Sequence, residues 1–428
     1  MNRIFYLLFL ISLSVSSQKL SYSPYSYFGV GDTGFSATAE NQMMGGITSY
    51  ADSAQVNLNN AASLSKLKFV NYLIGVDLKS TSFKNNNTNE SSTSAGLKYI
   101  AVSVPVVSGI ERKNLFSFSF GIKPNTSVGY LLENNIEDLP TPELNRFEGD
   151  GGINSAFLSV AFELFKNVGF GISSSYSFGS LNHYHSKILQ DVELYTKVSN
   201  ESSLSGLDYT FSTFYQRKIS ENLSLYSSFS HKPNNDLNSR NSQTIATLKA
   251  DGGFGGDSES IDLQAIGLDR TKVKMPAMNT FGIGLGQDKK WFFGVSYKSV
   301  AEGGYKNRIM NLDNVSFKSS KLYSAGGFFI PKYDSFTNFF DTLTYRFGVR
   351  YLSGGLYVNN QQINDFGINF GVGIPLAGLS KANVGFEFGQ RGTNEAGLIK
   401  ENYFSVKLGF SLNDVWFIKS LYLSLIHI

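Results

Sequence analysis

The segment NLFSFSFGI (Asn114–Ile122) places a large apolar side chain at every second position. These positions are Phe116, Phe118, Phe120 and Ile122, and the residues between them are serine or glycine. Successive side chains of a strand point to opposite faces, so the segment predicts a strand with one apolar face and one small, polar face.

The same alternation recurs along the chain and predicts an all-β fold of about fourteen strands. The predicted strands span residues 67–83, 95–107, 114–123, 153–164, 168–180, 205–217, 222–232, 278–286, 291–300, 318–330, 343–352, 364–375, 382–390 and 402–412. Long and short connections alternate between these spans, which is typical of a transmembrane antiparallel β-barrel in an outer membrane. The longest connection, residues 233–277, is expected to contain structure of its own.

The apolar faces are assigned to lipid and the polar faces to the barrel interior, because only helices and closed sheets satisfy the backbone inside a membrane. Five aromatic residues near strand ends are predicted to lie at the membrane interfaces. They are Tyr130, Tyr176, Trp291, Tyr351 and Trp416. The alternative is a large soluble β-sandwich whose apolar faces meet in a core.

Composition excludes several classes of function. The 428 residues include 36 Phe, 23 Tyr and 42 Gly but no Cys, which rules out thiol chemistry and cysteine metal sites. The net charge is only +3, and no basic cluster indicates a nucleic-acid partner. No motif indicates a cofactor, and the chain is predicted to be a monomer surrounded by membrane lipid.

The ends of the chain predict four regions. Residues 1–17 have the layout of a secretory signal peptide, with Arg3 followed by about a dozen apolar residues and then small ones. Residues 18–66 are expected to enter from the periplasm and form an N-terminal hatch, residues 67–412 the barrel, and residues 413–428 a periplasmic tail. The last residues, 420–428, lack alternation and are suspected not to be native.

Three stretches resemble a known family. They are SPYSYFGVGD (residues 23–32), MMGGITSYADSAQVNLNNAASLS (residues 43–65) and QRGTNEAGLIKENYFSVKLGFSLNDVWFIK (residues 390–419). The chain resembles the FadL-like superfamily of outer-membrane transport proteins, in its PorV-related branch from Bacteroidetes. The resemblance implies a fourteen-stranded barrel plugged by an N-terminal hatch.

The resemblance also implies a function. FadL-like proteins take up hydrophobic or amphipathic small molecules passively, and PorV-like members instead dock type IX secretion machinery or surface proteins. The family's Asn-Pro-Ala hatch signature aligns with Asn60, Ala61 and the residues to Ser63, so Ala61 replaces the proline. Asn59, Asn60, Ala61 and Ser63 are therefore the candidate ligand-channel residues of the hatch.

Four further residues are assigned to the lumen. Arg346 and Arg350 share the polar face of one predicted strand and could hold an anionic group or pair with acids such as Asp52 or Glu387. Gly282 and Gly284 share one face of another strand and would leave room for the hatch or for a ligand.

Catalytic chemistry is weakly indicated, and the chain is predicted not to be an enzyme. His183 and His185, in a predicted loop, have a spacing that could bind metal, but no third ligand lies nearby in the sequence. His231 could serve a lipase only with a serine partner. DGGFGGDSES (Asp251–Ser260) resembles a Ca²⁺ loop in composition but lacks the EF-hand spacing.

Overall fold

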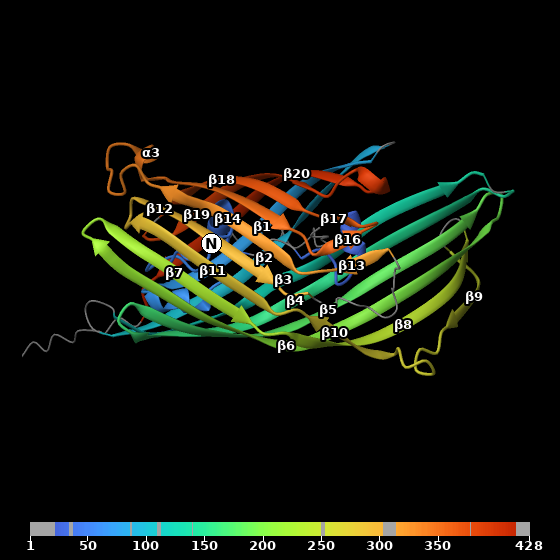
Figure 1. The fold of residues 1–428 in the computed structure, drawn as a ribbon, viewed down its shortest axis with the longest axis horizontal. Helices are drawn as coiled ribbons and strands as arrows, with labels where there is room; N and C mark the ends of the chain where they lie inside the picture. The colour runs from blue at the N-terminus through green and yellow to red at the C-terminus, as the bar shows by residue number, and fades with distance from the viewer. Residues whose placement is uncertain are drawn as a thin grey trace, which may run out of the picture.

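The computed structural model describes residues 22–33, 37–85, 88–108, 113–138, 140–249, 253–302, 314–376 and 378–416. These residues form a closed antiparallel β-barrel, seen from the side in Figure 1. The barrel closes because β1 (Val70–Lys84) pairs with β2 (Asn89–Ser108) on one side and with β20 (Lys400–Asp414) on the other. The predicted all-β barrel is confirmed.

The remaining wall strands follow in chain order. They are β3 (Lys113–Ile136), β4 (Glu143–Phe165), β5 (Val168–Leu189), β6 (Leu194–Ser220), β7 (Leu223–Lys232), β8 (Asn235–Lys249), β10 (Arg270–Met275), β11 (Met278–Gln287), β12 (Trp291–Val300), β14 (Ser320–Phe329), β15 (Thr344–Ser353), β18 (Asp365–Pro375) and β19 (Lys381–Arg391). β9 (Phe254–Ser260) pairs only with β8, and β13 (Val315–Phe317), β16 (Leu356–Val358) and β17 (Gln361–Gln362) form a small separate sheet. The short helices are η1 (Pro24–Tyr27), α2 (Ala39–Met43), η2 (Ala61–Lys66), α3 (Phe339–Thr342) and η3 (Glu395–Gly397).

Two wall strands are each interrupted by a proline. β7 and β8 both pair with β6 and are separated by Pro233 and Asn234. β10 and β11 pair with β8 and β7 and are separated by Pro276 and Ala277. Proline has no backbone N–H to donate to a ladder, so it interrupts pairing without ending the strand direction. With each interrupted pair taken as one strand, the wall has the predicted fourteen.

The side chains of β3 follow the predicted alternation. Phe116 and Phe120 are 42% and 46% exposed, whereas Ser117 and Ser119 are at most 1% exposed. The phenylalanine side therefore points out of the barrel, and the serine side points into it. A soluble sandwich would bury the phenylalanine side instead, so that alternative is wrong.

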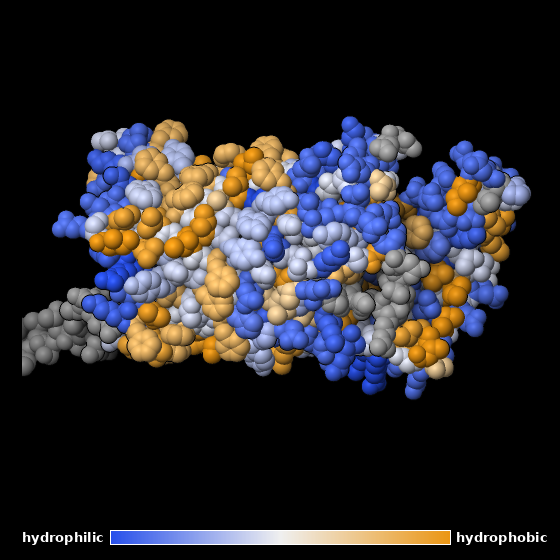
Figure 2. Space-filling model, viewed as in Figure 1, coloured by the Kyte–Doolittle hydropathy of each residue, from blue (hydrophilic) through white to orange (hydrophobic). Residues whose placement is uncertain are grey.

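Exposed apolar residues cover the outside of the wall strands as a group. They include Ile74, Leu158, Ile172, Tyr209, Ile283, Val295, Phe347, Phe370, Phe388 and Phe410. On the face shown in Figure 2, hydrophobic residues gather over the half of the molecule that carries β11, β12, β14 and β18, and hydrophilic residues are more numerous toward β8 and β13. Tyr176, Tyr351 and Trp416 are exposed as predicted, but Tyr130 points inward and is only 3% exposed, so its placement in an interfacial belt is wrong.

The strands on one side of the barrel are longer than predicted. β3 to β6 continue through most of residues 124–152 and 181–204, which the sequence assigned to loops. Most of their outward positions are polar there, with exceptions such as Leu131, so the apolar alternation that marks the membrane-facing part is lost while the ladder continues. The long connection 233–277 contains β8, β9 and β10, which confirms that it has structure of its own.

The ladder between β2 and β3 stops part-way along the wall. It runs from Ser108↔Lys113 to Ile100↔Ile122, beyond which β2 pairs only with β1 and β3 only with β4. One edge of β3 beyond Ile122 therefore has no partner in the wall.

Two terminal predictions fall outside the described residues: the signal peptide, residues 1–17, and the suspect residues 420–428. Within the described part of the chain, no helix is both long and apolar enough to cross a membrane.

Candidate functional site

Residues 22–33 and 37–66, here called the N-terminal segment, pack against the inward-facing side of the wall. Within this segment, α2 contacts β15, β18, β19 and β20, and η2 contacts β2 to β6. All five residues of α2 are buried. The segment thus lies against both halves of the barrel and leaves only part of the lumen free.

Asn60 begins η2 and fixes its start. Its side-chain oxygen accepts a hydrogen bond from the Ala62 backbone N–H, and its Nδ2 donates to the carbonyl of Thr48 over 3.2 Å. An asparagine at this position satisfies a helix N–H that would otherwise lack an acceptor. Ser63 closes the turn by donating from Oγ to the carbonyl of Asn60, at 2.7 Å. The side chains of Asn60 and Ser63 are therefore both engaged in hydrogen bonds that hold η2 in place.

Asn59 and Ala61, which the sequence assigned to a hatch, border an internal cavity. Next to them, the Ala62 N–H donates to Ser212 Oγ of β6 at 2.9 Å. A methyl group on Gly171 of β5 would lie 2.4 Å from the Ala62 nitrogen, so only glycine lets η2 approach the wall this closely. The role of Asn59, Asn60, Ala61 and Ser63 in a ligand channel stays a prediction.

Gly282 and Gly284 make room for other parts of the protein. A Cβ on Gly282 would lie 2.8 Å from Thr48 Oγ1 of the N-terminal segment, and one on Gly284 would lie 2.4 Å from the Phe292 ring. Phe292 packs 4.8 Å from the Tyr50 ring, centroid to centroid. These glycines therefore allow tight packing of the segment, and their part in a ligand path stays a prediction.

Arg346 connects the wall to α2 through an amide. Its NH1 donates to Asn383 Oδ1 at 2.9 Å, and Asn383 Nδ2 donates to Glu40 Oε1 at 2.9 Å. The arginine is 3% exposed, as expected for a lumen position. The suggested partner Asp52 instead accepts from the backbone N–H groups of Ala54 and Gln55.

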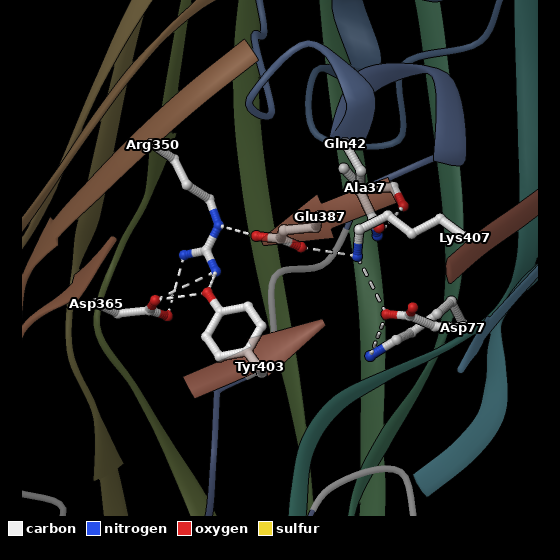
Figure 3. A network of polar contacts seen from close by, with 9 residues as sticks. Ala37, Gln42, Asp77, Arg350, Asp365, Glu387, Tyr403 and Lys407 are labelled. Carbon is white, nitrogen blue, oxygen red and sulfur yellow. Dashed lines mark hydrogen bonds and ion pairs between the residues drawn. The ribbon is translucent and has the colours of Figure 1, made fainter. Parts of the chain in front are cut away.

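Arg350 belongs to an ion-pair network on the inner wall, shown in Figure 3. Arg350 Nε donates to Glu387 Oε1 at 2.7 Å, which confirms the suggested partner Glu387. Lys407 Nζ lies 3.0 Å from Glu387 Oε2 and 3.2 Å from Asp77 Oδ2. The full network, here called the paired cluster, comprises Asp77, Lys98, Arg350, Asp365, Glu387, Tyr403 and Lys407.

The paired cluster balances its own charge. Three cations, Lys98, Arg350 and Lys407, face three carboxylates, and Tyr403 donates to Asp365 Oδ1 at 2.7 Å. Buried charges that are mutually paired and hydrogen-bonded avoid most of the cost of leaving water. This network has no need of a ligand to neutralise it.

The N-terminal segment also occupies the unpaired edge of β3. The Asp32 N–H donates to the Ser127 carbonyl at 2.8 Å and the Ser127 N–H returns the bond at 3.0 Å, while the Ser23 N–H donates to the Gly129 carbonyl at 2.8 Å. Asp32 further pairs with Arg391 NH1 at 2.8 Å. The gap between β2 and β3 is thus bridged from inside by the segment, which satisfies the free backbone groups of β3.

A cavity of about 470 Å³ remains between the N-terminal segment and the wall. Three lysines border it on a different part of the wall from the paired cluster: Lys123 of β3, Lys232 of β7 and Lys298 of β12. Lys232 Nζ pairs with Asp208 Oδ2 of β6 at 2.9 Å. These three lysines with Asp208 are called the lysine cluster.

The three described histidines each lie within hydrogen-bond distance of an uncharged side chain. His183 and His185 lie on β5 rather than in a loop, which corrects the sequence reading. His183 Nδ1 is 2.7 Å from the Tyr130 hydroxyl, and His185 Nε2 is 3.0 Å from Asn145 Oδ1. His231 Nδ1 lies 2.7 Å from Asn279 Oδ1. No group of three or more potential metal ligands occurs among the described residues.

Comparison with known proteins identifies the family. The BamG family model matches residues 1–422. The chain belongs to the BamG family. None of the curated proteins compared with it matches.

Solved structures with the same fold include toluene transporters and a FadL homologue. The toluene transporter TbuX of Ralstonia pickettii is 12% identical and has a TM-score of 0.54, with 89% of this chain and 98% of TbuX covered. The toluene transporter TodX of Pseudomonas putida is 14% identical, with coverage of 89% and 98% and a TM-score of 0.53. A Pseudomonas aeruginosa FadL homologue is 9% identical, with coverage of 89% and 99% and a TM-score of 0.53. At these identities the similarity establishes the FadL-like fold alone, and the PorV-related branch stays a prediction.

Sequence reasoning missed the lysine cluster of this BamG-family chain. Each lysine lies on the small, polar face of its strand, the same signal that identified Arg346 and Arg350. What the sequence lacks is the barrel's cross-section, which brings β3, β7 and β12 to one cavity.

Proposed function

We propose that this protein resides in the outer membrane and admits a small amphipathic compound passively into its lumen, with the N-terminal segment as a hatch. The observation that carries the proposal is the cavity of about 470 Å³ between the segment and the wall, a volume typical of small-molecule sites. Its lining combines charged and hydroxyl groups with apolar side chains such as Met275, Met278 and Leu322. Such a lining suits a ligand with one polar and one apolar end.

The proposed mechanism needs no covalent step. A ligand enters the cavity and passes on when the N-terminal segment moves away from β3. The contacts that hold the segment there include two backbone hydrogen bonds between Asp32 and Ser127, the Ser23 N–H bond to the Gly129 carbonyl, and the ion pair between Asp32 and Arg391. A few such contacts can break without unfolding the barrel, because they lie outside the wall ladders.

A reversible tether tests the hatch. The chain has no native cysteine, and Asp32 and Ser127 face each other across an antiparallel bridge, a spacing that accepts a disulfide. In proteoliposomes, the oxidised double variant Asp32→Cys/Ser127→Cys should take up decanol more slowly than its reduced form. The single variant Asp32→Cys is the control, because it loses the ion pair with Arg391 but cannot form the tether. Equal rates before and after reduction would contradict the hatch role.

A docking role is the second candidate, and one surface favours it. The connection between β14 and β15 exposes Phe336, Phe339 and Phe340, with Phe336 fully exposed. Exposed aromatic groups of this kind are common where proteins contact partners. If docking is the main role, the variant Phe336→Ser/Phe339→Ser/Phe340→Ser should lose a co-migrating partner on native gels of membrane extracts while keeping probe uptake.

A further inference from the structure

We propose that the lysine cluster is a binding site for the oxyanion head group, a carboxylate or a phosphate, of an amphipathic ligand. The inference rests on the proposed function and names the chemistry of the ligand. It begins with an imbalance of charge. Lys123, Lys232 and Lys298 share one carboxylate, Asp208, which leaves two positive charges uncompensated inside the barrel.

The two uncompensated charges belong to Lys123 and Lys298. Among the described residues, neither lysine has a carboxylate within ion-pair distance, whereas Lys232 lies 2.9 Å from Asp208. Lys123, Lys232, Lys298 and Asp208 all border the same cavity, so the four groups form one site. Cations held together away from bulk water repel one another, and an anion between them removes that cost.

The strand register places hydroxyl groups beside the lysines. Lys298 of β12 pairs with Thr280 of β11, and Thr280 pairs with Ser230 of β7, so the three residues form a row across neighbouring strands. Ser230 is 94% buried, and its Oγ has no hydrogen-bond partner among the residues that the structure describes. Ser230 and Thr280 both border the cavity. A buried hydroxyl without a partner is unusual, and a ligand oxygen next to Lys298 would satisfy it.

The wall beside the site is interrupted. The β6–β7 ladder ends at Phe211↔His231 and the β6–β8 ladder begins at Ser205↔Asn238, so residues 206–210 of β6 have no ladder partner on this side. Asp208 lies in the middle of this stretch, and Lys232 directly precedes Pro233. The Lys232–Asp208 ion pair therefore spans the interruption, where few backbone bonds hold the wall rigid.

Apolar side chains continue from the site along the cavity. Met275 and Met278 flank the interruption at Pro276, and Val300 and Leu322 border the cavity beside them. On the outer side of the same stretch, Leu207 and Tyr209 are 54% and 48% exposed. An alkyl tail attached to the anionic head group thus finds apolar surface within the cavity.

The test is binding of matched ten-carbon probes by calorimetry, with the full chain in nanodiscs of neutral lipid. Decanoate should bind about 10–100-fold more tightly than decanol, because a charge-assisted hydrogen bond distinguishes them. The double variant Lys123→Gln/Lys298→Gln should remove this preference. The matched control is Lys79→Gln/Lys318→Gln, which removes two lysines that border the same cavity outside the cluster and should keep it.

Further arms separate the sources of the anion and guard against misfolding. Inorganic phosphate that competes with decanoate indicates a site for the head group alone, and nanodiscs of anionic lipid that abolish decanoate binding indicate that a lipid supplies it. If the double variant fails to fold, the wild-type protein still decides, since raising NaCl from 20 to 500 mM should weaken decanoate binding and leave decanol binding unchanged.

The two proposals fail differently. Equal affinity for decanoate and decanol, or a preference that survives in the double variant, overturns the anion site even if proteoliposomes take up decanol. Preferential decanoate binding without uptake of either probe overturns passage through the barrel and leaves the site standing.

Discussion

The lumen contains two groups of charges that solve the problem of burial in opposite ways. The paired cluster on β1, β2, β15, β18, β19 and β20 matches three cations with three carboxylates, whereas the lysine cluster on β3, β6, β7 and β12 matches three cations with one. The first group lies partly on the regular ladders of β15, β18, β19 and β20, and the second lies beside the interruption at Pro233. A self-neutral network stabilises the wall, and an unbalanced one has capacity for a ligand.

The largest effect is expected from Glu387→Gln, which breaks the paired cluster. Glu387 pairs with both Arg350 and Lys407, so its loss leaves two buried cations short of a partner. We expect the free energy of unfolding to fall by about 3–5 kcal/mol. Urea unfolding followed by tryptophan fluorescence measures it, with the exposed Glu395→Gln as control. A loss equal to that of the control would mean that the network does not stabilise the barrel.

A smaller loss is expected from Asp208→Asn, which sharpens the imbalance of the lysine cluster. The change removes the carboxylate paired with Lys232 and should lower the free energy of unfolding by about 1.5–3 kcal/mol. Decanoate affinity should rise in the same variant, because the three lysines then face the cavity without the Asp208 carboxylate. Unchanged stability with unchanged affinity would contradict the assignment of Asp208 to the cluster.

A pH effect outside both clusters comes from His183. Its outward neighbours on β5 are Ser180, Asn182 and Tyr184, so it lies beyond the apolar part of the wall. Burial lowers the pKa of His183 to about 4 from 6.5, with Asp150 partly opposing the shift. Between pH 6.5 and pH 4 the unfolded chain therefore binds a proton at His183 that the folded chain does not bind. Stability that is present above pH 6.5 is lost as the pH falls toward 4.

From pH 8 to pH 5.5 this loss amounts to about 1.4 kcal/mol. Unfolding at the two pH values measures it, and His183→Gln should lose less stability over the same interval. An equal loss in the variant would contradict the assignment of the acid sensitivity to His183.

The smallest effect is expected from Lys298→Gln. Because Lys298 has no carboxylate within ion-pair distance among the described residues, its neutralisation should change the free energy of unfolding by less than about 0.5 kcal/mol or raise it slightly. Unfolding at low salt, where charge repulsion is strongest, is the appropriate measurement. A loss approaching that of Glu387→Gln would remove the contrast between the clusters.

The alternation of apolar and polar residues predicts the wall because each strand has one face toward lipid and one toward the lumen. Phe120 can be assigned to the lipid face and Ser119 to the lumen face from the sequence of their own strand alone. The same reasoning fails for β3 beyond Ile122, because most outward positions there are polar. It also fails for Tyr130, which points inward and contacts His183 of β5. Arg350 could be placed in the lumen, but its neighbours Asp365 and Lys407 depend on the register of other strands.

The lysine cluster shows the same limit. Lys123 and Lys298 are 175 residues apart in sequence, and only closure of the barrel brings them to one cavity. The N-terminal segment likewise bonds to Ser127 and Gly129 only because the β2–β3 ladder stops below them. The alternation within a strand predicts which face of the wall a residue occupies. The closure of the barrel decides which residues of other strands it contacts there.

The central claim is that the apolar faces of the strands meet lipid and the polar faces meet the lumen. Since the chain has no native cysteine, single cysteines at positions 116–122 of β3 can each carry a nitroxide label in proteoliposomes. The account predicts that positions 116, 118, 120 and 122 collide with oxygen dissolved in the bilayer, whereas positions 117, 119 and 121 are shielded from it. Equal oxygen accessibility along the segment, or the opposite alternation, would contradict it.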